Sequence, residues 1–435
     1  MISKNSFTAL LKWLLKRVVY LRKEFQNIVA RLIYQPQSHF VLHKWNGHKC
    51  PYESILFYNF TGRVLFVLKE LLALVSGNKI TRKSIRLEGF EAIDLATLYQ
   101  TGSDTVLWPR SPMVMLGKRE VPASFFDKIE RSYHLASQQN HVVKTKWWEQ
   151  VAHNIKAWIF ETNGALKREA VVDFRRGSRF EEIITDQFSY IDTKRNYISE
   201  YLKAIDVVLE YHRFAQHIRK EILASFSESY AGNNSCIVYR GKRLSEKSLF
   251  YATCVQDITT NIPLNSMHRS VICDIGTGYG GLPTMLRYYM QKSCQILIDI
   301  PEVTIFTAYY IRYNFPDAKI ALLEDLQKSN FPALLEKYDF IIIPPEYISQ
   351  IPDASVDLVT NTASLGFLDH ETTDIYLSEI ARMLKSGGYF YSVNQTSGKE
   401  AGVGMYEWDF KAEYLTIFLS YSNRFAYLQW LGQKR

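Results

Sequence analysis

The segment between residues 274 and 302 combines glycines and carboxylates in a spacing that suits the binding of a nucleotide. Gly276, Gly278 and Gly281 have the G-x-G-x-x-G spacing of dinucleotide-binding turns. Glycine permits positive φ angles and lets a ligand approach the backbone closely. No Lys-Ser or Lys-Thr pair follows, so the spacing is not that of a P-loop. The glycines alone leave two possibilities open, a nucleotide site and a glycine-rich turn without a ligand.

An aspartate and a short apolar segment follow the glycines at a suitable distance. Asp299 ends a second apolar run, 23 residues after Gly276, where a carboxylate can accept hydrogen bonds from both hydroxyls of a ribose. Ile300 and Pro301 come next and offer an apolar wall on which a purine could stack. The alternative for Asp299 is an ordinary polar residue at a strand end.

Alternating strands and helices must position these residues. Short apolar runs predict strands, and helical stretches lie between several of them, with strands at 271–275, 295–299, 319–323, 339–343, 356–360 and 388–393. This alternation is typical of an α/β fold with a doubly wound, mostly parallel sheet. Ligands in such sheets bind at the carboxyl ends of the strands, where Asp299 and the glycines fall.

The sequence before this region predicts a mainly helical N-terminal part. We divide the chain into residues 1–50, a basic amphipathic helix and linker, residues 51–254, a mainly helical region for acceptor binding or assembly, and residues 255–435, the α/β domain. Ser245 is placed to cap a helix that runs to about Thr259.

Residues 1–35 contain a basic amphipathic helix with one apolar stripe. Two interpretations stay open: the helix contacts an anionic membrane surface, or it packs on the protein or on a partner chain. The stretch is neither a signal peptide nor a span, because lysines and arginines interrupt its short apolar runs. A peripheral contact would place a cytoplasmic protein at the inner membrane surface.

Charge and cysteine content argue against several classes of binding site. The net charge of +8 arises mostly in residues 1–50, where Glu24 is the only acid, and no platform of interleaved aromatics accompanies it, so we expect no nucleic-acid partner. The five cysteines are odd in number and form no C-x-x-C pair, which argues against disulfides and zinc and for a reducing cytoplasm. No cluster of metal ligands is visible, so we expect no metal, although a metal-assisted acceptor site stays open.

The combined motifs resemble those of the class I S-adenosylmethionine-dependent methyltransferases. The matching elements are Asp274-x-Gly276-x-Gly278-x-Gly280, then Asp299, then Pro352-Asp353-x-Ser355-x-Asp357-Leu358-Val359, then Leu384-Lys385-x-Gly387-Gly388. The resemblance covers about residues 255–435 and implies a Rossmann-like fold with S-adenosylmethionine as cofactor. A nicotinamide-binding domain has no Leu-Lys-x-Gly-Gly turn, which makes an oxidoreductase the weakest alternative.

A narrower resemblance is to the sugar O-methyltransferases encoded in bacterial surface-polysaccharide gene clusters. Four segments carry it, namely Asp-Ile-Pro-Glu at 299–302, Asn-Phe-Pro-Asp at 314–317, Ile-Pro-Asp-x-Ser-Val-Asp at 351–357 and Gly-Tyr-Phe-Tyr-Ser-Val-Asn at 388–394. It implies transfer of a methyl group to a sugar hydroxyl in polysaccharide or glycan biosynthesis. Two alternatives stay open, a methyltransferase for another small or lipid-linked acceptor and a non-catalytic cofactor-binding assembly subunit. The oligomeric state is open, with a homo-oligomer as one option.

The class I resemblance also implies which residues hold the cofactor. Gly276, Thr277 and Gly278 would approach its methionine and ribose parts, within a motif that ends at Gly280. Asp274 would bind the amino-acid end, directly or through water.

Further along, the resemblance places residues around the nucleoside. Asp299 would hold the ribose hydroxyls, and Ile300 would lie against the adenine. Pro345 and Glu346 fall where such enzymes contact adenine, although an aspartate is usual at the second position.

The remaining candidates concern the transfer itself. Asn361 and Ser364 sit where the methyl group and the acceptor should meet. A sugar hydroxyl is weakly acidic, so a general base should help. His370 is the first candidate for that base, and Asp369 and Glu302 are the reserves. The alternative for His370 is a solvent-exposed histidine without a catalytic role.

Overall fold

The computed structural model describes residues 86–88, 119–138, 146–176, 180, 207–208, 211, 215, 218–234, 236–239, 242–263, 269–395, 402–408, 413–421 and 427–435. The basic helix expected in residues 1–35 lies outside them. In the described part of the chain, no helix has both the length and the apolar character that crossing a bilayer requires.

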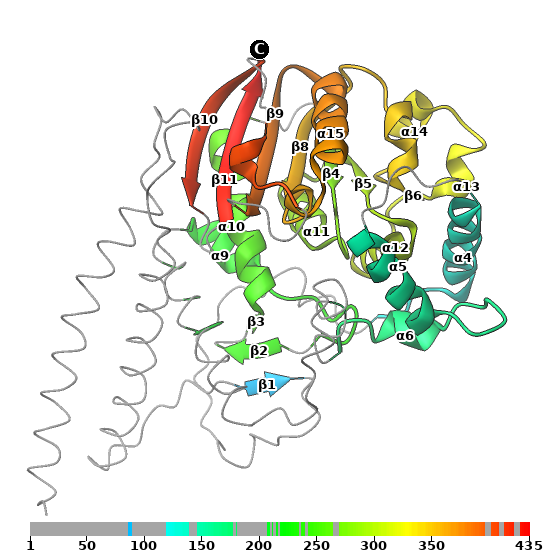
Figure 1. Ribbon diagram of the computed structural model, residues 1–435. Coiled ribbons are helices and arrows are strands. Elements are labelled where there is room, and N and C mark those ends of the chain that lie inside the picture. Colours follow the sequence, from blue (N-terminus) through cyan, green and yellow to red (C-terminus); the bar gives the residue numbers. More distant parts are fainter. Residues whose placement is uncertain are drawn as a thin grey trace, which may run out of the picture.

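An eight-stranded sheet forms the centre of the described structure (Figure 1). Its order is β10-β11-β9-β8-β4-β5-β7-β6, with β4 (Ser270–Ile275), β5 (Ser293–Ile298), β6 (Ile320–Ala321), β7 (Phe340–Ile343), β8 (Val356–Thr362), β9 (Leu384–Gln395), β10 (Tyr414–Tyr421) and β11 (Tyr427–Lys434). The strands from β6 to β9 pair in parallel, whereas β11 and β10 add an antiparallel edge. All six predicted strands are confirmed, as is the mostly parallel Rossmann-like fold; β10 and β11 were not predicted.

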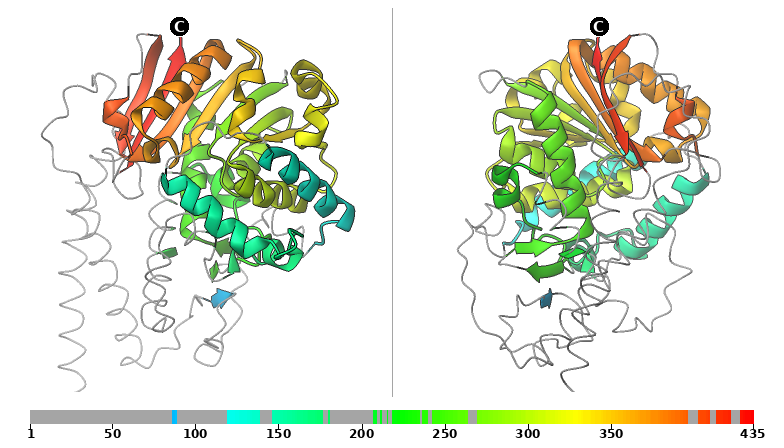
Figure 2. Two further views of the ribbon diagram at one scale, coloured as in Figure 1. Left: turned by 45° about the vertical axis from the view of Figure 1, so that its right-hand side comes forward. Right: turned by 90° about the vertical axis from the view of Figure 1, so that its left-hand side faces the viewer.

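Helices cover both faces of this sheet (Figure 2). They are α10 (Glu246–Asn261), α11 (Gly281–Tyr289), α12 (Pro301–Asn314), α13 (Leu323–Leu326), α14 (Phe331–Lys337) and α15 (His370–Met383), with 3-10 turns η4 (Pro345–Gln350), η5 (Leu365–Phe367) and η6 (Met405–Glu407). Ser245 caps α10 by accepting a hydrogen bond from the Ser248 N–H at 3.0 Å, which confirms the expected helix start.

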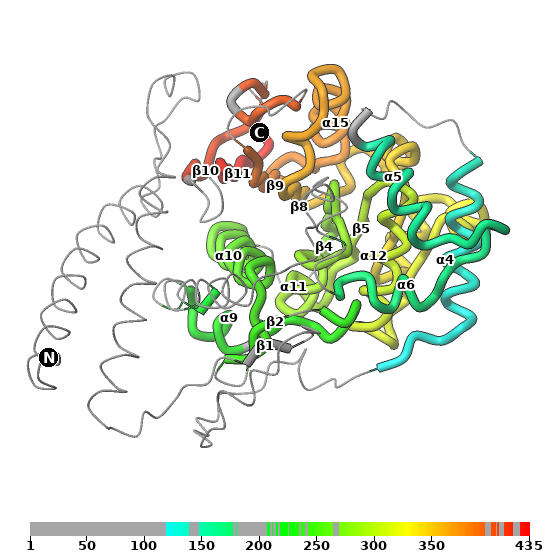
Figure 3. Tube along the Cα trace, turned by 60° about the horizontal axis from the view of Figure 1, so that its bottom comes forward, coloured from blue at the N-terminus to red at the C-terminus, as the bar shows by residue number. Residues whose placement is uncertain are grey.

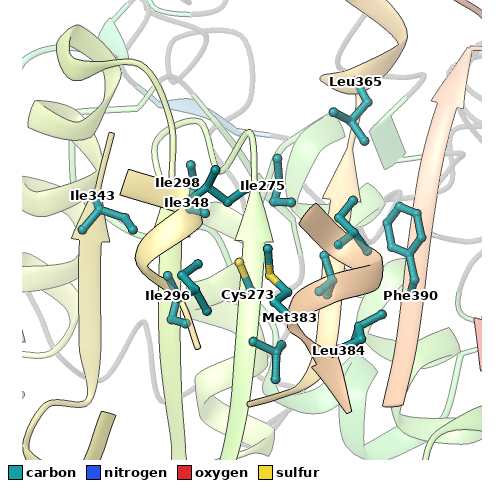
Figure 4. Packing of buried hydrophobic residues seen from close by; sticks show 14 of the residues in the cluster. Cys273, Ile275, Ile296, Ile298, Ile343, Ile348, Leu365, Met383, Leu384 and Phe390 are labelled. Atoms are coloured by element: carbon teal, nitrogen blue, oxygen red, sulfur yellow. The ribbon is translucent and has the colours of Figure 1, made fainter. Parts of the chain in front are cut away.

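Successive residues of the central strands face opposite layers, because side chains alternate along a strand. Cys273 and Ile275 of β4 pack with Met383 of α15 on one face (Figure 4). Ile272, the residue directly before Cys273, packs on the other face with Leu286 of α11. Both faces are apolar, as a parallel sheet covered on both sides requires. This double burial fixes the register that brings the strand ends to one edge.

The glycine turn at Gly387 lies inside strand β9, which corrects the prediction of a turn before a strand at 388. Val356 of β8 is opposite Leu384, but Leu358 is already opposite Tyr389. The extra residues of β9 form a bulge, and Gly387 adopts the positive φ of 75° that this bulge requires. Residues 384–388 are therefore an irregular part of the sheet itself.

The preceding part of the chain contains several helices and a small three-stranded antiparallel sheet. It contains β1 (Arg86–Glu88), α4 (Ala123–Ser137), α5 (Lys146–Ile159), α6 (Arg168–Val172), α9 (Lys220–Ser225), β2 (Cys236–Tyr239) and β3 (Lys242–Leu244). Figure 3 shows α4, α5 and α6 beside α12. Side chains of these helices share one buried cluster with α12 and with strands β5 and β7 of the eight-stranded sheet. The boundary between residues 254 and 255 stays a prediction, and helix α10 runs across it.

Candidate functional site: a cavity at the carboxyl ends of the central strands

A cavity of about 590 Å³, including its mouth, opens at the carboxyl ends of β4, β5 and β8. It is lined by Trp148, Ile275, Gly276, Ile298, Asp299, Ile300, Pro345, Glu346, Ser364, Leu365, Leu368, Thr372 and Tyr376. Most of these side chains are apolar, and two carboxylates stand among them.

The glycine turn after β4 needs its glycines for two reasons. Gly276, Gly278 and Gly280 all have positive φ, at 68°, 56° and 90°, where a side chain would be strained. A Cβ on Gly276 would also overlap the Ser364 side chain, so this glycine lets the two loops meet. A Cβ on Gly278 would instead enter open space.

Asp299 ties the end of β5 to this glycine turn. Its Oδ2 accepts a hydrogen bond from the Gly278 N–H at 2.7 Å, and its Oδ1 accepts one from the Ile300 N–H at 2.8 Å. Burial raises the pKa of Asp299 to about 7, although the two N–H donors oppose this shift. The side chain lines the cavity and is 8% exposed. Its carboxylate is thus fixed in orientation and can accept further hydrogen bonds from a ligand.

Asp274 lies beneath the turn. Its Oδ1 accepts a hydrogen bond from Thr360 Oγ1 at 2.5 Å, which joins β4 to β8. Burial raises the pKa of Asp274 to about 7, and hydrogen bonding by Thr360 and Thr277 lowers it in part. Asp274 does not line the cavity, and it is 2% exposed. Its observed contacts hold the loop from below.

A network of amides shapes the loop after β8. Asn361 donates from Nδ2 to the Ile275 carbonyl at 2.7 Å and to Ser364 Oγ at 2.6 Å. Asn394 of β9 donates to Asn361 Oδ1 at 2.7 Å and accepts from the Ser364 N–H at 3.1 Å. These bonds hold Ser364 against Gly276. Ala363, which directly precedes Ser364 in the chain, adopts a φ of 55°. The loop is therefore built to a fixed shape at the edge of the cavity.

Residues 273–392 match a family described as "Methyltransferase domain". These residues form a methyltransferase domain, and their mostly parallel sheet has the Rossmann-like class I fold. The cofactor of this domain is S-adenosylmethionine.

The described residues fit this cofactor. Asp299 offers an oriented carboxylate for ribose hydroxyls, and the open space beside Gly278 lets a ligand approach the turn. Ile300 and Pro345 give the same cavity an apolar section for the base.

Several solved methyltransferase structures are similar to the chain. Mitomycin 7-O-methyltransferase is 14% identical, with 43% of this chain and 57% of that chain covered and a TM-score of 0.28. Geranyl diphosphate C-methyltransferase from Streptomyces coelicolor A3(2) is 11% identical over 44% and 80%, with a TM-score of 0.30. A SAM-dependent methyltransferase from Aquifex aeolicus is 16% identical over 38% and 82%, with a TM-score of 0.26. No curated protein matches the chain.

The residues predicted to bind the cofactor fall into two groups in the methyltransferase domain. The first group lines the cavity and comprises Gly276, Asp299, Ile300, Pro345, Glu346 and Ser364. The second group does not line it and comprises Asp274, Thr277, Gly278, Gly280 and Asn361. Members of the second group shape the loops: Gly280, for example, is the residue before helix α11. Their contact with the cofactor stays a prediction.

The three candidates for the catalytic base do not meet at one point, and none of them lines the cavity. His370 begins α15, its side chain is 69% exposed, and its Nε2 lies 3.7 Å from a Glu407 carboxylate oxygen. Asp369 caps the same helix, because its Oδ1 accepts from the Thr372 N–H at 2.8 Å. Glu302 is buried in the first turn of α12, where the Tyr133 hydroxyl donates to it at 3.4 Å.

Several residues of the cavity wall were not predicted. Thr372 and Tyr376 lie four residues apart on α15, the helix that begins at His370. Residues at this spacing share one face of a helix, so the sequence could have indicated that both face the site. Burial raises the pKa of Tyr376, and the nearby Asp299 and Glu346 carboxylates add to this shift. Trp148 comes from α5, far from every motif, and no local pattern indicates it. Among the described residues, no cluster of three or more His, Cys, Asp or Glu could hold a metal ion.

Proposed function

We propose that this protein is an O-methyltransferase that methylates a sugar hydroxyl during polysaccharide or glycan biosynthesis. The observation that carries the methyl transfer is the cavity that joins Asp299 to the Gly276–Ser364 contact, within a methyltransferase domain. The sugar acceptor is supported by the resemblance of residues 299–302, 314–317, 351–357 and 388–394 to the sugar O-methyltransferases.

The chain's own part in the reaction is chiefly to position the reactants. When bound, S-adenosylmethionine supplies an electrophilic methyl group. Asp299 would fix the ribose, and the Asn361–Asn394–Ser364 network would hold the loop beside the reacting groups. Alignment of this kind can contribute several kcal/mol to a rate acceleration, up to about 7–11 kcal/mol.

A base at the rim of the cavity would accept the proton of the acceptor hydroxyl. His370 remains the proposed base, because it stands two residues after Leu368 and two before Thr372, and both of these line the cavity. Histidine is also the side chain that most often acts as a general base in enzymes. Asp369 and Glu302 are engaged in a helix cap and a buried hydrogen bond, which makes them weaker candidates.

Location is a separate proposal that rests on the sequence of residues 1–35. We propose a cytoplasmic enzyme that contacts the inner membrane surface through this basic amphipathic segment. The acceptor would then be met where lipid-linked glycans are assembled.

Labelled cofactor and a panel of acceptors test the proposed function. Transfer of the methyl label to nucleotide sugars or glycans supports it, and transfer only to other small or lipid-linked acceptors contradicts the sugar assignment. Cofactor binding without transfer to any acceptor would favour the assembly subunit. Mass spectrometry of surface glycans with and without the protein would then identify the modified hydroxyl.

A further inference from the structure

One wall of the cofactor cavity comes from outside the segment that matches the methyltransferase family. Among the described residues that line the cavity, Trp148 alone precedes residue 273, where the family match begins. It belongs to α5 of the helical N-terminal part. Its indole shares the cavity with Ile300 and Pro345, the two residues expected beside the base.

Helix α5 is held firmly in the place that brings Trp148 to the cavity. Ile155 and Ile159 are fully buried in the cluster that α5 shares with α12. The indole of Trp158 stacks on the Phe306 ring of α12, with centroids 5.5 Å apart and planes inclined by 29°. Because α12 begins at Pro301, directly after Asp299 and Ile300, a helix packed along it can reach the end of β5.

The chemistry of the cofactor decides which of its parts can meet Trp148. Asp299 marks the ribose, and the base is bonded directly to that sugar. Gly276 is expected beside the methionine portion and Ser364 beside the methyl group. The apolar section next to Asp299, formed by Ile300, Pro345 and Trp148, is therefore the section available to the base. Indole offers a flat surface on which a base stacks well.

We propose that Trp148 stacks on the adenine of the cofactor and that the helical N-terminal part thereby completes the cofactor site. The methyltransferase domain alone then has an open adenine section. This inference rests on the cofactor assignment and is independent of the acceptor, so it survives even if the sugar substrate is wrong.

Titration of the full chain with S-adenosylhomocysteine tests the proposal. Loss of one base–aromatic stack should raise the Kd of Trp148→Ala about 5- to 150-fold, whereas Trp148→Phe, which keeps an aromatic ring, should stay within about fivefold of the wild type. Adenosine, which lacks the amino-acid portion, should lose affinity by the same factor. Trp158→Phe is the matched control, because it also removes one indole from α5 but lies outside the cavity wall.

Tryptophan emission gives a second readout that does not depend on the alanine variant folding. S-adenosylhomocysteine should quench the wild-type protein and Trp158→Phe, and the quench should largely disappear in Trp148→Phe. An unchanged quench in Trp148→Phe, or an unchanged Kd in a folded Trp148→Ala, would overturn the proposal. So would a loss for S-adenosylhomocysteine without a loss for adenosine. Failure of the wild type to bind S-adenosylhomocysteine would refute the cofactor assignment itself, which is a distinct result.

Discussion

Replacing Asp299 by asparagine should weaken cofactor binding without unfolding the protein. The carboxylate accepts the N–H groups of Gly278 and Ile300, at 2.7 and 2.8 Å, and is placed to accept ribose hydroxyls as well. Asparagine keeps the size of the side chain and one acceptor oxygen. It removes the negative charge and places an amide NH₂, a hydrogen-bond donor, where the second acceptor oxygen of Asp299 stood. A hydrogen bond to a charged group contributes about 1.5–3 kcal/mol, so the Kd should rise about 10- to 150-fold.

Calorimetric titration with S-adenosylhomocysteine measures this change, with thermal unfolding to show that the variant is folded. Asp357→Asn is the matched control. Asp357 also accepts a backbone N–H, that of Val271 at 2.7 Å, but it lies near the start of β8 and does not line the cavity. A folded Asp299→Asn protein with wild-type affinity would remove Asp299 from the site and refute the reasoning.

The pH dependence of the same residue gives a sharper test, because binding and stability should change in opposite directions. The pKa of Asp299 is raised by burial to about 7, from about 3.9 in an unfolded chain. A raised carboxyl pKa stabilises the free protein fully below about pH 4, and this stabilisation is lost as pH rises through 7. Ribose hydroxyls need the ionised carboxylate, so affinity should rise over the same range.

Asp274 has a pKa near 7 for the same reason and adds to the loss of stability. Affinity for S-adenosylhomocysteine measured from pH 6 to 8 should increase as Asp299 ionises, and the increase should be shallower in Asp299→Asn, which lacks that titrating group. Equal slopes in the two proteins would mean that Asp299 does not titrate in this range.

Four further changes test other parts of the molecule. Gly278→Val should abolish cofactor binding, since valine is strained at a φ of 56° and its side chain would enter the open space beside the turn; normal binding by calorimetry would contradict this. His370→Ala should slow single-turnover transfer about 10²- to 10⁴-fold at saturating cofactor with little change in affinity, and near wild-type turnover would exclude it as the base. Arg175→Met should lower the free energy of unfolding by about 3–5 kcal/mol, measured with denaturant, because it leaves the Glu228 carboxylate buried and unpaired. Deleting residues 1–35 should reduce flotation with anionic liposomes, each basic residue contributing about 1 kcal/mol; equal flotation would mean that the segment only packs on protein.

The central fold could be predicted because its strands carry local signals. Runs such as 271–275 and 339–343 are short, apolar and bounded by polar or turn residues, which suits strands buried on both faces. Strands β10 and β11 lack that signal. They form an antiparallel edge that is exposed in places, with Leu415 52% exposed, and uncharged polar residues such as Thr416, Ser420 and Gln429 interrupt their apolar pattern.

The site could be predicted only in part, for a related reason. Asp299 and Gly276 belong to one motif whose spacing is fixed by a strand, a turn and a helix, and both line the cavity. The roles of Asn361 and Trp148 depend on which distant segments pack together. Asn361 has the polar character expected at a strand end, but its amide bonds to Ile275 and Asn394 and turns it inward. Spacing along the chain does not indicate such contacts.

The glycine turn is held from the N-terminal part of the chain as well as from its own strand. Tyr279 sits in the turn and is buried, and the Arg175 guanidinium lies 4.2 Å from the centroid of its ring. Arg175 in turn pairs with Glu228 at 2.7 Å, and Glu228 also accepts from Ser245, the residue that caps α10. A buried charge pair of this kind requires both partners to be in place, since either one alone would be costly. The turn that the cofactor approaches is thereby coupled to folding of the helical part, so the two parts act as one unit in forming the site.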